Sequence, residues 1–488
     1  MPPHIRVGHI ARRHGEKAQS KDDYEKTTDL KKLHHQSEDN TLDGTRGIKS
    51  PRLCEHQLFL RQLLIWRFFN QLPSSRATDW MKASKLKFAI FAYFAGTVLI
   101  YAAIFWNMRE LVREGYPDFA IYYRAGIIVR RGLGRRLYDD ATQVKVQREF
   151  SPAVAVRSGA LPYNHPPFEA ALFVPFTYVS FPSAFALWDL TNLAILVTLP
   201  FLLRPHLSAL QTYSWPLWVL TSLAFFPIFA ALLQGQDAIL LLFFYAPAFV
   251  CLKKNRDACA GAWLALGLFK PHLVLPFIFL LLLQDRKKIL YGFLPMAAVL
   301  ALVSTAIVGP EGIKLYPAYV AHLEQTLAGG AIVPSDMPNL RGALDFFLSG
   351  IPHMVTAVLL ISLGLLLHTA LVCRRIGKNL FDLKFSLAAI TTVLVSYHAM
   401  MYDLSLLMVP VLLLANHLLA HDKFRGYRSA LTIMAMATFF FAPLQLLLSL
   451  RHHRSAPLGW VLLLWLSAIA GEISFRTSSR GQVNDAHG

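Results

Sequence analysis

Between residues 88 and 472 the chain consists of long apolar runs that short polar segments interrupt. The first run, Phe88–Trp106, is long enough to cross the roughly 30 Å hydrocarbon core of a bilayer. The runs are continuous rather than alternating, which argues against a membrane β-barrel. The sequence therefore predicts an all-α polytopic membrane protein with about 10 to 13 transmembrane helices or half-spans.

Basic residues indicate how the chain is oriented in the membrane. The net charge is +18, and no compact basic motif with interleaved aromatic residues points to nucleic acid. Because lysine and arginine are retained on the cytoplasmic side, the main basic segments are predicted to be cytoplasmic. They are Lys82, Lys85 and Lys87, and residues 253–256, 286–288, 374–378 and 423–428.

This orientation divides the chain into three parts. Residues 1–87 are predicted to be a basic, largely disordered cytoplasmic segment with a candidate interfacial helix at Gln57–Leu72, since the segment is polar before this stretch. Residues 88–472 form the transmembrane domain, and residues 473–488 form a cytoplasmic tail. The segments 107–165 and 309–350 are then loops on the outer face.

The parity of crossings between residues 166 and 213 stays open. The run 166–180 is short and begins with two prolines, so it fits a re-entrant or interfacial segment. If it instead crosses the membrane, Arg204–Tyr213 falls on the outer side, against the charge rule.

Two polar residues stand out beside or within apolar runs. Asp118 follows the first run closely and can act as a general base or as a helix N-cap. Lys270 interrupts the run Ala258–Leu283 next to Pro271. An intramembrane lysine is costly and suggests function, here as a phosphate ligand at the tip of two half-spans. A snorkelling lysine that only fixes helix depth is the alternative.

Arginines are unusually frequent in the first outer loop, which holds Arg124 and a cluster between Arg130 and Arg136. Their planar guanidinium groups match phosphate oxygens, although a helix lying on acidic lipids fits equally well. In the second outer loop, Arg341 is a candidate ligand for phosphate or sugar, or a simple solvated charge.

Two further turns carry hydrogen-bonding groups. Gln234, Gln236 and Asp237 can bind a sugar or simply break a helix. His398, Tyr402 and Asp403 can bind a polar ligand or form a water-exposed turn.

Known cofactor and hydrolase signatures are missing from the sequence. It has no H-E-x-x-H, phosphate-loop or G-x-S-x-G pattern, and its four cysteines show no metal-binding spacing and predict no disulfide network. The sequence therefore identifies no cofactor and no metal ligands, and metal dependence stays open. Without a nucleotide site, an enzyme of this kind needs a lipid-borne or otherwise preactivated substrate.

Several short motifs, taken in order, resemble glycosyltransferase family 87, the polyprenol-phosphate-mannose-dependent mannosyltransferases of the GT-C fold. The resemblance covers about residues 88–420. The motifs that carry it are Asp118-Phe119 with Tyr122-Tyr123-Arg124-Ala125, Leu137-Tyr138-Asp139, Tyr163-Asn164-His165-Pro166-Pro167-Phe168, Gly235-Gln236, Leu268-Phe269-Lys270-Pro271, Leu340-Arg341-Gly342 and the Tyr397–Leu404 turn.

The resemblance implies inverting transfer of a hexose, mannose first, from a polyprenyl-phosphate donor to a glycolipid or glycan acceptor on the extracytoplasmic face. Asp118 would be the general base. Lys270, Arg341 and Arg124 would bind the donor phosphate. By the same analogy the sugar and acceptor would meet Tyr122, Tyr123, Gln236, His398, Tyr402 and Asp403, and the protein would lie among the lipids of a bacterial inner membrane.

An ion-coupled transporter or lipid-glycan flippase is the alternative, because half-spans with buried cations also suit a carrier. Against it, the two halves of the sequence show no clear internal repeat.

Overall fold

The computed structural model describes residues 77–154, 161–327, 333–348, 353–374, 380–420, 427–452 and 454–485. These residues all belong to the unit Phe68–Gly488. Within them every regular element is a helix and there is no strand, which confirms the predicted all-α class. The candidate interfacial helix at Gln57–Leu72 lies outside the described residues.

The α-helices, in chain order, have the following bounds: α2 Ala77–Asn107, α3 Arg109–Glu114, α4 Phe119–Arg130, α5 Asp140–Phe150, α6 Pro167–Phe173, α7 Phe181–Leu203, α8 Trp215–Ala224, α9 Phe226–Gln234, α10 Ala238–Lys253, α11 Asp257–Leu266, α12 Pro271–Leu283, α13 Leu290–Leu327, α14 Leu340–Leu348, α15 Met354–Arg374, α16 Phe381–Val395, α17 Met408–Leu419, α18 Tyr427–Phe440, α19 Ala442–Gln445 and α20 Pro457–Asp485. Short 3₁₀ turns include η2, Val174–Tyr178, and η7, Met401–Leu407.

Among the described residues, six helical segments are long and apolar enough to cross a membrane, or eight if two bent helix pairs each count as one span. The bent pairs are α8 with α9, at 72°, and α18 with α19 and the turn after it, at 63°. Three shorter apolar helices, α10, α11 and α12, add half-spans. The protein is therefore a polytopic membrane protein.

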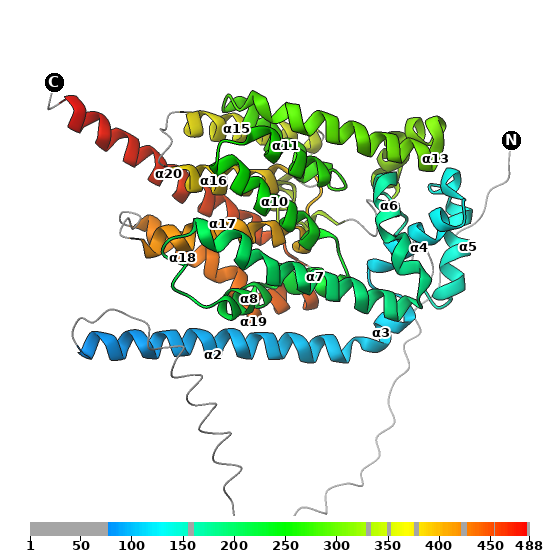
Figure 1. Ribbon diagram of the computed structural model, residues 1–488, viewed down its shortest axis with the longest axis horizontal. Coiled ribbons are helices and arrows are strands. Elements are labelled where there is room, and N and C mark those ends of the chain that lie inside the picture. The colour runs from blue at the N-terminus through cyan, green and yellow to red at the C-terminus, as the bar shows by residue number, and fades with distance from the viewer. Residues whose placement is uncertain are drawn as a thin grey trace, which may run out of the picture. The chain divides into compact units, whose positions relative to one another are not determined.

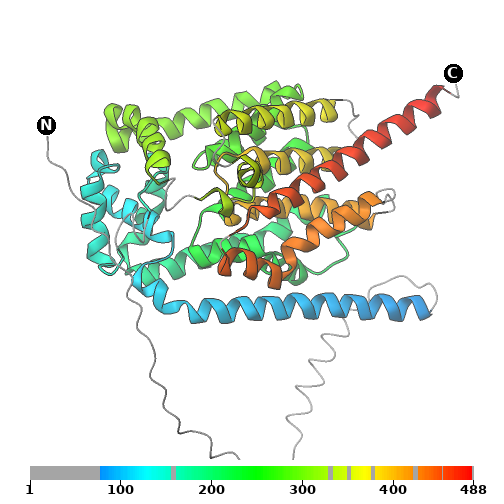
Figure 2. The same cartoon turned by 180° about the vertical axis from the view of Figure 1, so that it is seen from behind.

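The long helices run side by side, with α2 and α13 at opposite edges of the view and α4, α5 and α6 gathered at one end (Figure 1). Figure 2 shows the reverse side, where α20 (red) lies toward the viewer and runs diagonally across the neighbouring helices. Since α4, α5 and α6 lie in and beside the predicted first outer loop, that loop packs as an ordered helical layer on one end of the helices.

The helices are longer than the apolar runs. Helix α2 begins at Ala77, before the first run, and α20 continues to Asp485, through the predicted tail. Helix α13 continues past Gly309, where a φ of 75° marks a kink, into the predicted second outer loop. Polar residues can extend a helix beyond the hydrocarbon, so hydropathy alone places these ends too early or too late.

The crossing question at residues 166–213 has a structural answer. Helix α6 and the turn η2 are too short to span the membrane. Pro175 interrupts the run and Pro182 stands at the start of α7, because proline lacks the backbone N–H that a continuous helix needs. Helix α7 is therefore the single candidate span between the first outer loop and Arg204–Tyr213. These two segments lie at opposite ends of α7, as the charge rule requires.

Three of the basic breaks are tied together or to their neighbours by short polar contacts. Lys253 Nζ donates to Asp382 at 2.8 Å and to the carbonyl of His206 at 3.0 Å. Arg286 pairs with Asp257 at 2.7 Å, and Arg374 pairs with Asp285 at 3.5 Å.

A disulfide also joins Cys251 to Cys259 across the turn between α10 and α11, because that turn brings their Cα atoms to 6.0 Å. The sequence analysis had not predicted this pairing.

The run Ala258–Leu283 is divided as the sequence predicted. Helix α11 ends at Leu266 and α12 begins at Pro271. The backbone at Lys270, with φ −117° and ψ 70°, is not helical, because the ring of a following proline disfavours the α conformation. This break takes the Lys270 side chain out of any helix and leaves it in a turn.

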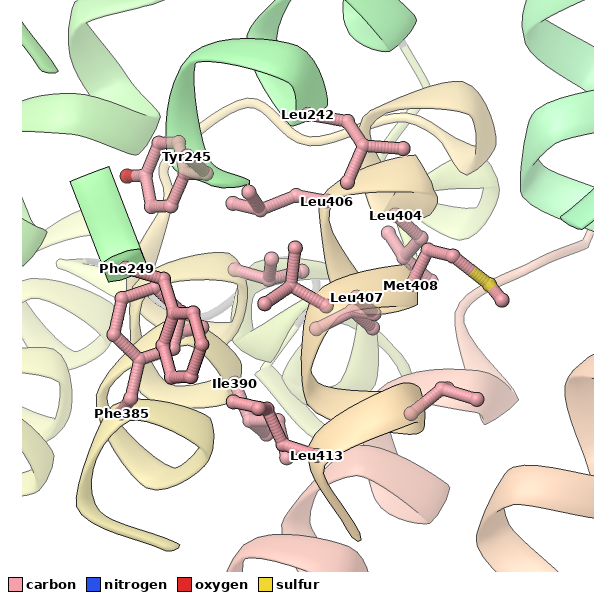
Figure 3. Packing of buried hydrophobic residues seen from close by; sticks show 14 of the residues in the cluster. Leu242, Tyr245, Phe249, Phe385, Ile390, Leu404, Leu406, Leu407, Met408 and Leu413 are labelled. Atoms are coloured by element: carbon pink, nitrogen blue, oxygen red, sulfur yellow. The ribbon is translucent and has the colours of Figure 1, made fainter. Parts of the chain in front are cut away.

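A buried apolar core holds the half-helices in place (Figure 3). Tyr245 and Phe249 of α10 pack with Phe385 of α16 and with Leu407 and the start of α17. The Tyr245 hydroxyl also donates to the carbonyl of Leu273 in α12 at 2.7 Å. This close packing holds α10 and α12, and with them the Lys270 turn, in position.

Helices α11 and α13 approach so closely that only glycine fits between them. A Cβ atom at Gly292 would lie 1.8 Å from the carbonyl oxygen of Ala258, and one at Gly261 would lie 2.0 Å from the carbonyl oxygen of Ile289. Backbone cannot yield as a side chain can, so this contact sets the spacing of the two helices.

We expect Gly292→Ala to destabilise the protein by about 1–3 kcal/mol, because the added methyl group forces α11 and α13 apart. Gly364→Ala is the matched control, since a Cβ there meets nothing within 4 Å and alanine favours the helix. Thermal unfolding in detergent, followed by size exclusion, measures both. Equal melting temperatures for the two variants would contradict the close packing.

Candidate active site

Asp118 immediately precedes α4, where a helix N-cap would lie, but its side chain makes no capping hydrogen bond. Its Oδ2 instead accepts a hydrogen bond from Gln236 Nε2 at 2.7 Å, and its backbone N–H donates to Gln234 Oε1 at 3.2 Å. The other end of the Gln236 amide accepts from the hydroxyl of Tyr122 at 2.8 Å. The geometry therefore assigns the carboxylate to a polar centre and not to a cap.

The turn that presents Gln236 depends on Gly235. This residue ends α9 with a φ of 61°, and a Cβ there would lie 2.7 Å from the Cβ of Phe119. Its carbonyl accepts a hydrogen bond from Trp188 Nε1 at 3.0 Å. Glycine is needed both for the left-handed backbone and for the close approach to α4.

Burial raises the pKa of the Asp118 carboxyl above its ordinary value. The hydrogen bond from Gln236 and the positive charge of Lys270 act in the opposite direction, while Asp237 and Asp403 raise the pKa further. A carboxylate of this kind is a stronger base than one in water, which suits a group that must take a proton.

Lys270 is buried, with 3% of its surface exposed, which does not fit a lysine that snorkels to water. Its Nζ lies 2.9 Å from Asp237 Oδ1 and 2.9 Å from Asp403 Oδ1, and 5.2 Å from the centre of the Tyr402 ring. Asp403 is held in turn by the backbone N–H of Met400, which donates to Oδ2 at 2.8 Å. The ammonium group thus joins the turn after α9 to the turn before α17.

His165 and Glu169, at the start of α6, lie next to Asp237. His165 Nδ1 lies 2.8 Å from Glu169 Oε2 and 3.9 Å from Asp237 Oδ2. Glu169 is in the first turn of α6, four residues after His165. Together with Asp237 they form a cluster whose ligand atoms all lie within 4.8 Å of one another.

Arg341 and His398 lie where the predicted second loop meets the turn after α16. Arg341 stacks on the ring of Tyr397, with its guanidinium carbon 4.1 Å from the ring centre. Asn339 Nδ2 donates to the carbonyl of Ser396 at 2.7 Å, and the His398 ring is 6.4 Å from that of His272. The two motifs, separated by more than fifty residues, therefore pack against each other.

Arg124 and Tyr123 point elsewhere. Arg124 is fully buried and donates to Gln147 Oε1 at 2.8 Å and to the carbonyl of Leu161 at 2.6 Å. The hydroxyl of Tyr123 donates to the carbonyl of Val179 at 2.7 Å. Both side chains hold α4 to its neighbours through these hydrogen bonds, and none of the bonds goes to Asp118 or Lys270.

Glu169 was not among the predicted site residues, and His165 was predicted only as part of the Tyr163–Phe168 motif. A glutamate within the apolar run 166–180, four residues after a histidine, was the available signal, because that spacing places both on one side of a helix start. The run was interpreted only as a crossing problem, so this signal was not used.

The fold and the site together define a polytopic membrane protein with a buried centre of carboxylates and one lysine beside its ordered loop layer. Residues 163–396 match the model of glycosyltransferase family 87. The protein is therefore a membrane glycosyltransferase. The matched region contains His165, Gln236, Asp237, Lys270 and Arg341. No curated protein and no solved structure matches the chain significantly.

We expect Lys270→Met to destabilise the protein by about 3–5 kcal/mol, because it leaves Asp237 and Asp403 buried without their cation. Adding Asp403→Asn should recover part of this loss. Thermal unfolding of the purified protein measures it.

Lys253→Met is the control, since its ion pair with Asp382 is partly exposed, at 30% and 23% of the two side chains, and should contribute less. A Lys270→Met variant no less stable than Lys253→Met would contradict the central role of the buried pair.

Proposed function

We propose that the protein transfers a hexose, with mannose as the first candidate, from a polyprenyl-phosphate donor to a hydroxyl group of a glycolipid or glycan. The observation that carries this proposal is the Asp118–Gln236 hydrogen bond beside the Lys270 ion pairs, in a chain that matches a glycosyltransferase family. Gln236 and its neighbour Asp237 connect the candidate base Asp118 to Lys270, the cation that would face the donor.

In the proposed reaction, Asp118 takes the proton of the acceptor hydroxyl as its oxygen attacks the anomeric carbon. The bond from that carbon to the phosphate oxygen breaks, and polyprenyl phosphate leaves with the electron pair. Attack from the face opposite the phosphate inverts the configuration. The proton on Asp118 then passes to solvent, which restores the carboxylate.

Lys270 and Arg341 are the proposed partners of the donor phosphate. An ammonium group and a guanidinium group both stabilise the negative charge that grows on the leaving phosphate. Gln236, Tyr122, Tyr402, Asp403 and His398 lie on the segments around them and are proposed to meet the sugar or the acceptor. Arg124, given its buried contacts, is proposed to act only by holding α4.

We place the reaction on the extracytoplasmic face. Lys253 and Arg374 are the last residues of α10 and α15, and Arg286 follows α12. Their ion pairs lie in the breaks that the charge rule assigns to the cytoplasm. Asp118 lies in the loop before α7, at the opposite end of that helix from Arg204. A bacterial inner membrane is the proposed location.

We expect Asp118→Asn to lower the rate of sugar transfer by about 10²–10⁴-fold, because a general base contributes that much. Purified protein, polyprenyl-phosphate mannose labelled in the sugar, and a membrane lipid extract provide the assay. Asp139→Asn is the control, since Asp139 caps α5 by accepting from Thr142 N–H at 2.9 Å and asparagine caps equally well. Undiminished transfer by folded Asp118→Asn would refute the assignment.

We expect the acid limb of kcat/KM to lie above the pH at which an ordinary aspartate titrates, because burial raises the pKa of Asp118 and only its ionised form accepts a proton. Gln236→Met removes the amide that stabilises the carboxylate, so the limb should move to still higher pH.

Tyr122→Phe is the matched control, because it removes the other hydrogen bond of Gln236 and leaves the one to Asp118. The pH profiles of the three proteins test this. A limb that does not move in Gln236→Met would show that another group titrates.

A further inference from the structure

The cluster of His165, Glu169 and Asp237 carries more negative charge than its neighbours offset. Glu169 and Asp237 are 1% and 0% exposed. Asp118 and Asp403 lie in the same polar centre, and Lys270 is the one cation that contacts it within 4 Å through the described ion pairs. Buried carboxylates that close together need a further cation or a shared proton.

The positions of the ligand atoms fit a metal ion. His165 Nδ1, Glu169 Oε2 and Asp237 Oδ2 approach one another at 2.8 and 3.9 Å around the histidine, within a 4.8 Å cluster. Ligands bound to one cation at about 2.1 Å lie roughly 3 Å apart. Small side-chain rotations are enough to bring the three atoms to one ion.

The carboxylate of Glu169 also lacks the partners that a purely structural residue would have. Both of its oxygens are buried and accept no hydrogen bond from a donor group among the described residues, and its neighbour on one side is the carboxyl group of Asp237. The nearest structural cation, Lys270, contacts Asp237 through Oδ1 and leaves Oδ2 facing His165. Asp237 Oδ1 therefore has Lys270 as its cation, whereas Asp237 Oδ2 and the Glu169 carboxylate have no lysine or arginine partner among the described ion pairs.

The backbone that carries His165 is held by three tyrosines. Tyr138 donates to the carbonyl of His165 at 2.8 Å, Tyr163 to that of Pro166 at 2.8 Å, and Tyr316 to that of Asn164 at 3.2 Å. The ring of Tyr122 packs edge-on against the imidazole. These contacts come from four different segments and hold the ligand nitrogen in position, as a preformed metal site requires.

From this geometry we propose that His165, Glu169 and Asp237 bind a divalent transition-metal cation such as Mn²⁺ or Zn²⁺. One imidazole and two carboxylates suit these ions better than Mg²⁺, which prefers oxygen ligands and water. A three-residue set leaves coordination positions open for an oxygen ligand. Resting on the proposed function, we infer that this ligand is the donor phosphate, which Asp237 places beside Lys270.

Binding of Mn²⁺ to the full chain in nanodiscs tests the site without donor or acceptor. Loss of the free Mn²⁺ signal in electron paramagnetic resonance gives stoichiometry and affinity, and competition by Zn²⁺ shows whether both ions share one site. We expect one Mn²⁺ per chain, displaced by Zn²⁺.

Glu169→Gln should weaken Mn²⁺ binding at least 10-fold, since it removes a charged ligand at nearly constant volume. Glu149→Gln is the matched control, because Glu149 is an exposed partner of Arg131 in the same loop layer and should bind as wild type. His165→Gln gives a second ligand variant if Glu169→Gln does not fold.

Two results would overturn the proposal. One is wild-type protein with no saturable binding of Mn²⁺ or Zn²⁺ up to millimolar concentration, which would mean that the two carboxylates share a proton instead. The other is binding that survives in both ligand variants, which would place the ion elsewhere. Since neither measurement uses sugar transfer, failure here leaves the proposed reaction to be judged by the Asp118 experiment.

Discussion

The ammonium group of Lys270, flanked by Asp237 and Asp403, is the contact on which the arrangement of the polar centre depends. Asp237 follows α9 and Asp403 precedes α17, so one nitrogen atom joins two turns 166 residues apart in the chain. Pro271 makes this contact available, because it prevents Lys270 from continuing a helix. The break between α11 and α12 places the charge of Lys270 inside the protein, and the packing of the half-helices α10, α11 and α12 supports this turn.

The polar groups around that nitrogen form a connected series. Asp118 is held by Gln236, the next residue is Asp237, and Asp237 faces both Lys270 and His165. Residues that are adjacent in the chain thus connect the candidate base to the candidate phosphate ligands. A glycine at 235, required by its backbone conformation and by the nearby ring of Phe185 and Cβ of Phe119, fixes the point from which the series starts.

Apolar run length and the positions of lysines and prolines were enough to predict the helical class and the break at Lys270, and a series of short motifs was enough to indicate the family. They were not enough for the partners of each charge. Lys270 was predicted as a phosphate ligand at the tip of two half-spans, but its two carboxylate partners, which come from distant turns, were not predicted. Arg124 was expected near the donor, yet Gln147 and Leu161 hold it. Periodicity reports the face of a helix, whereas these outcomes depend on which turns meet in space.

The amide of Gln236 has a consequence for the product. The amide nitrogen donates a hydrogen bond to Oδ2 of Asp118, and the amide oxygen accepts one from the hydroxyl of Tyr122. These two hydrogen bonds keep the amide from rotating freely. In the proposed reaction this leaves Oδ1 as the atom that receives the proton. An acceptor sugar carries several hydroxyl groups of similar reactivity, but only the one that can approach that single oxygen would react. The position of the new glycosidic bond would then depend on the amide that orients the base.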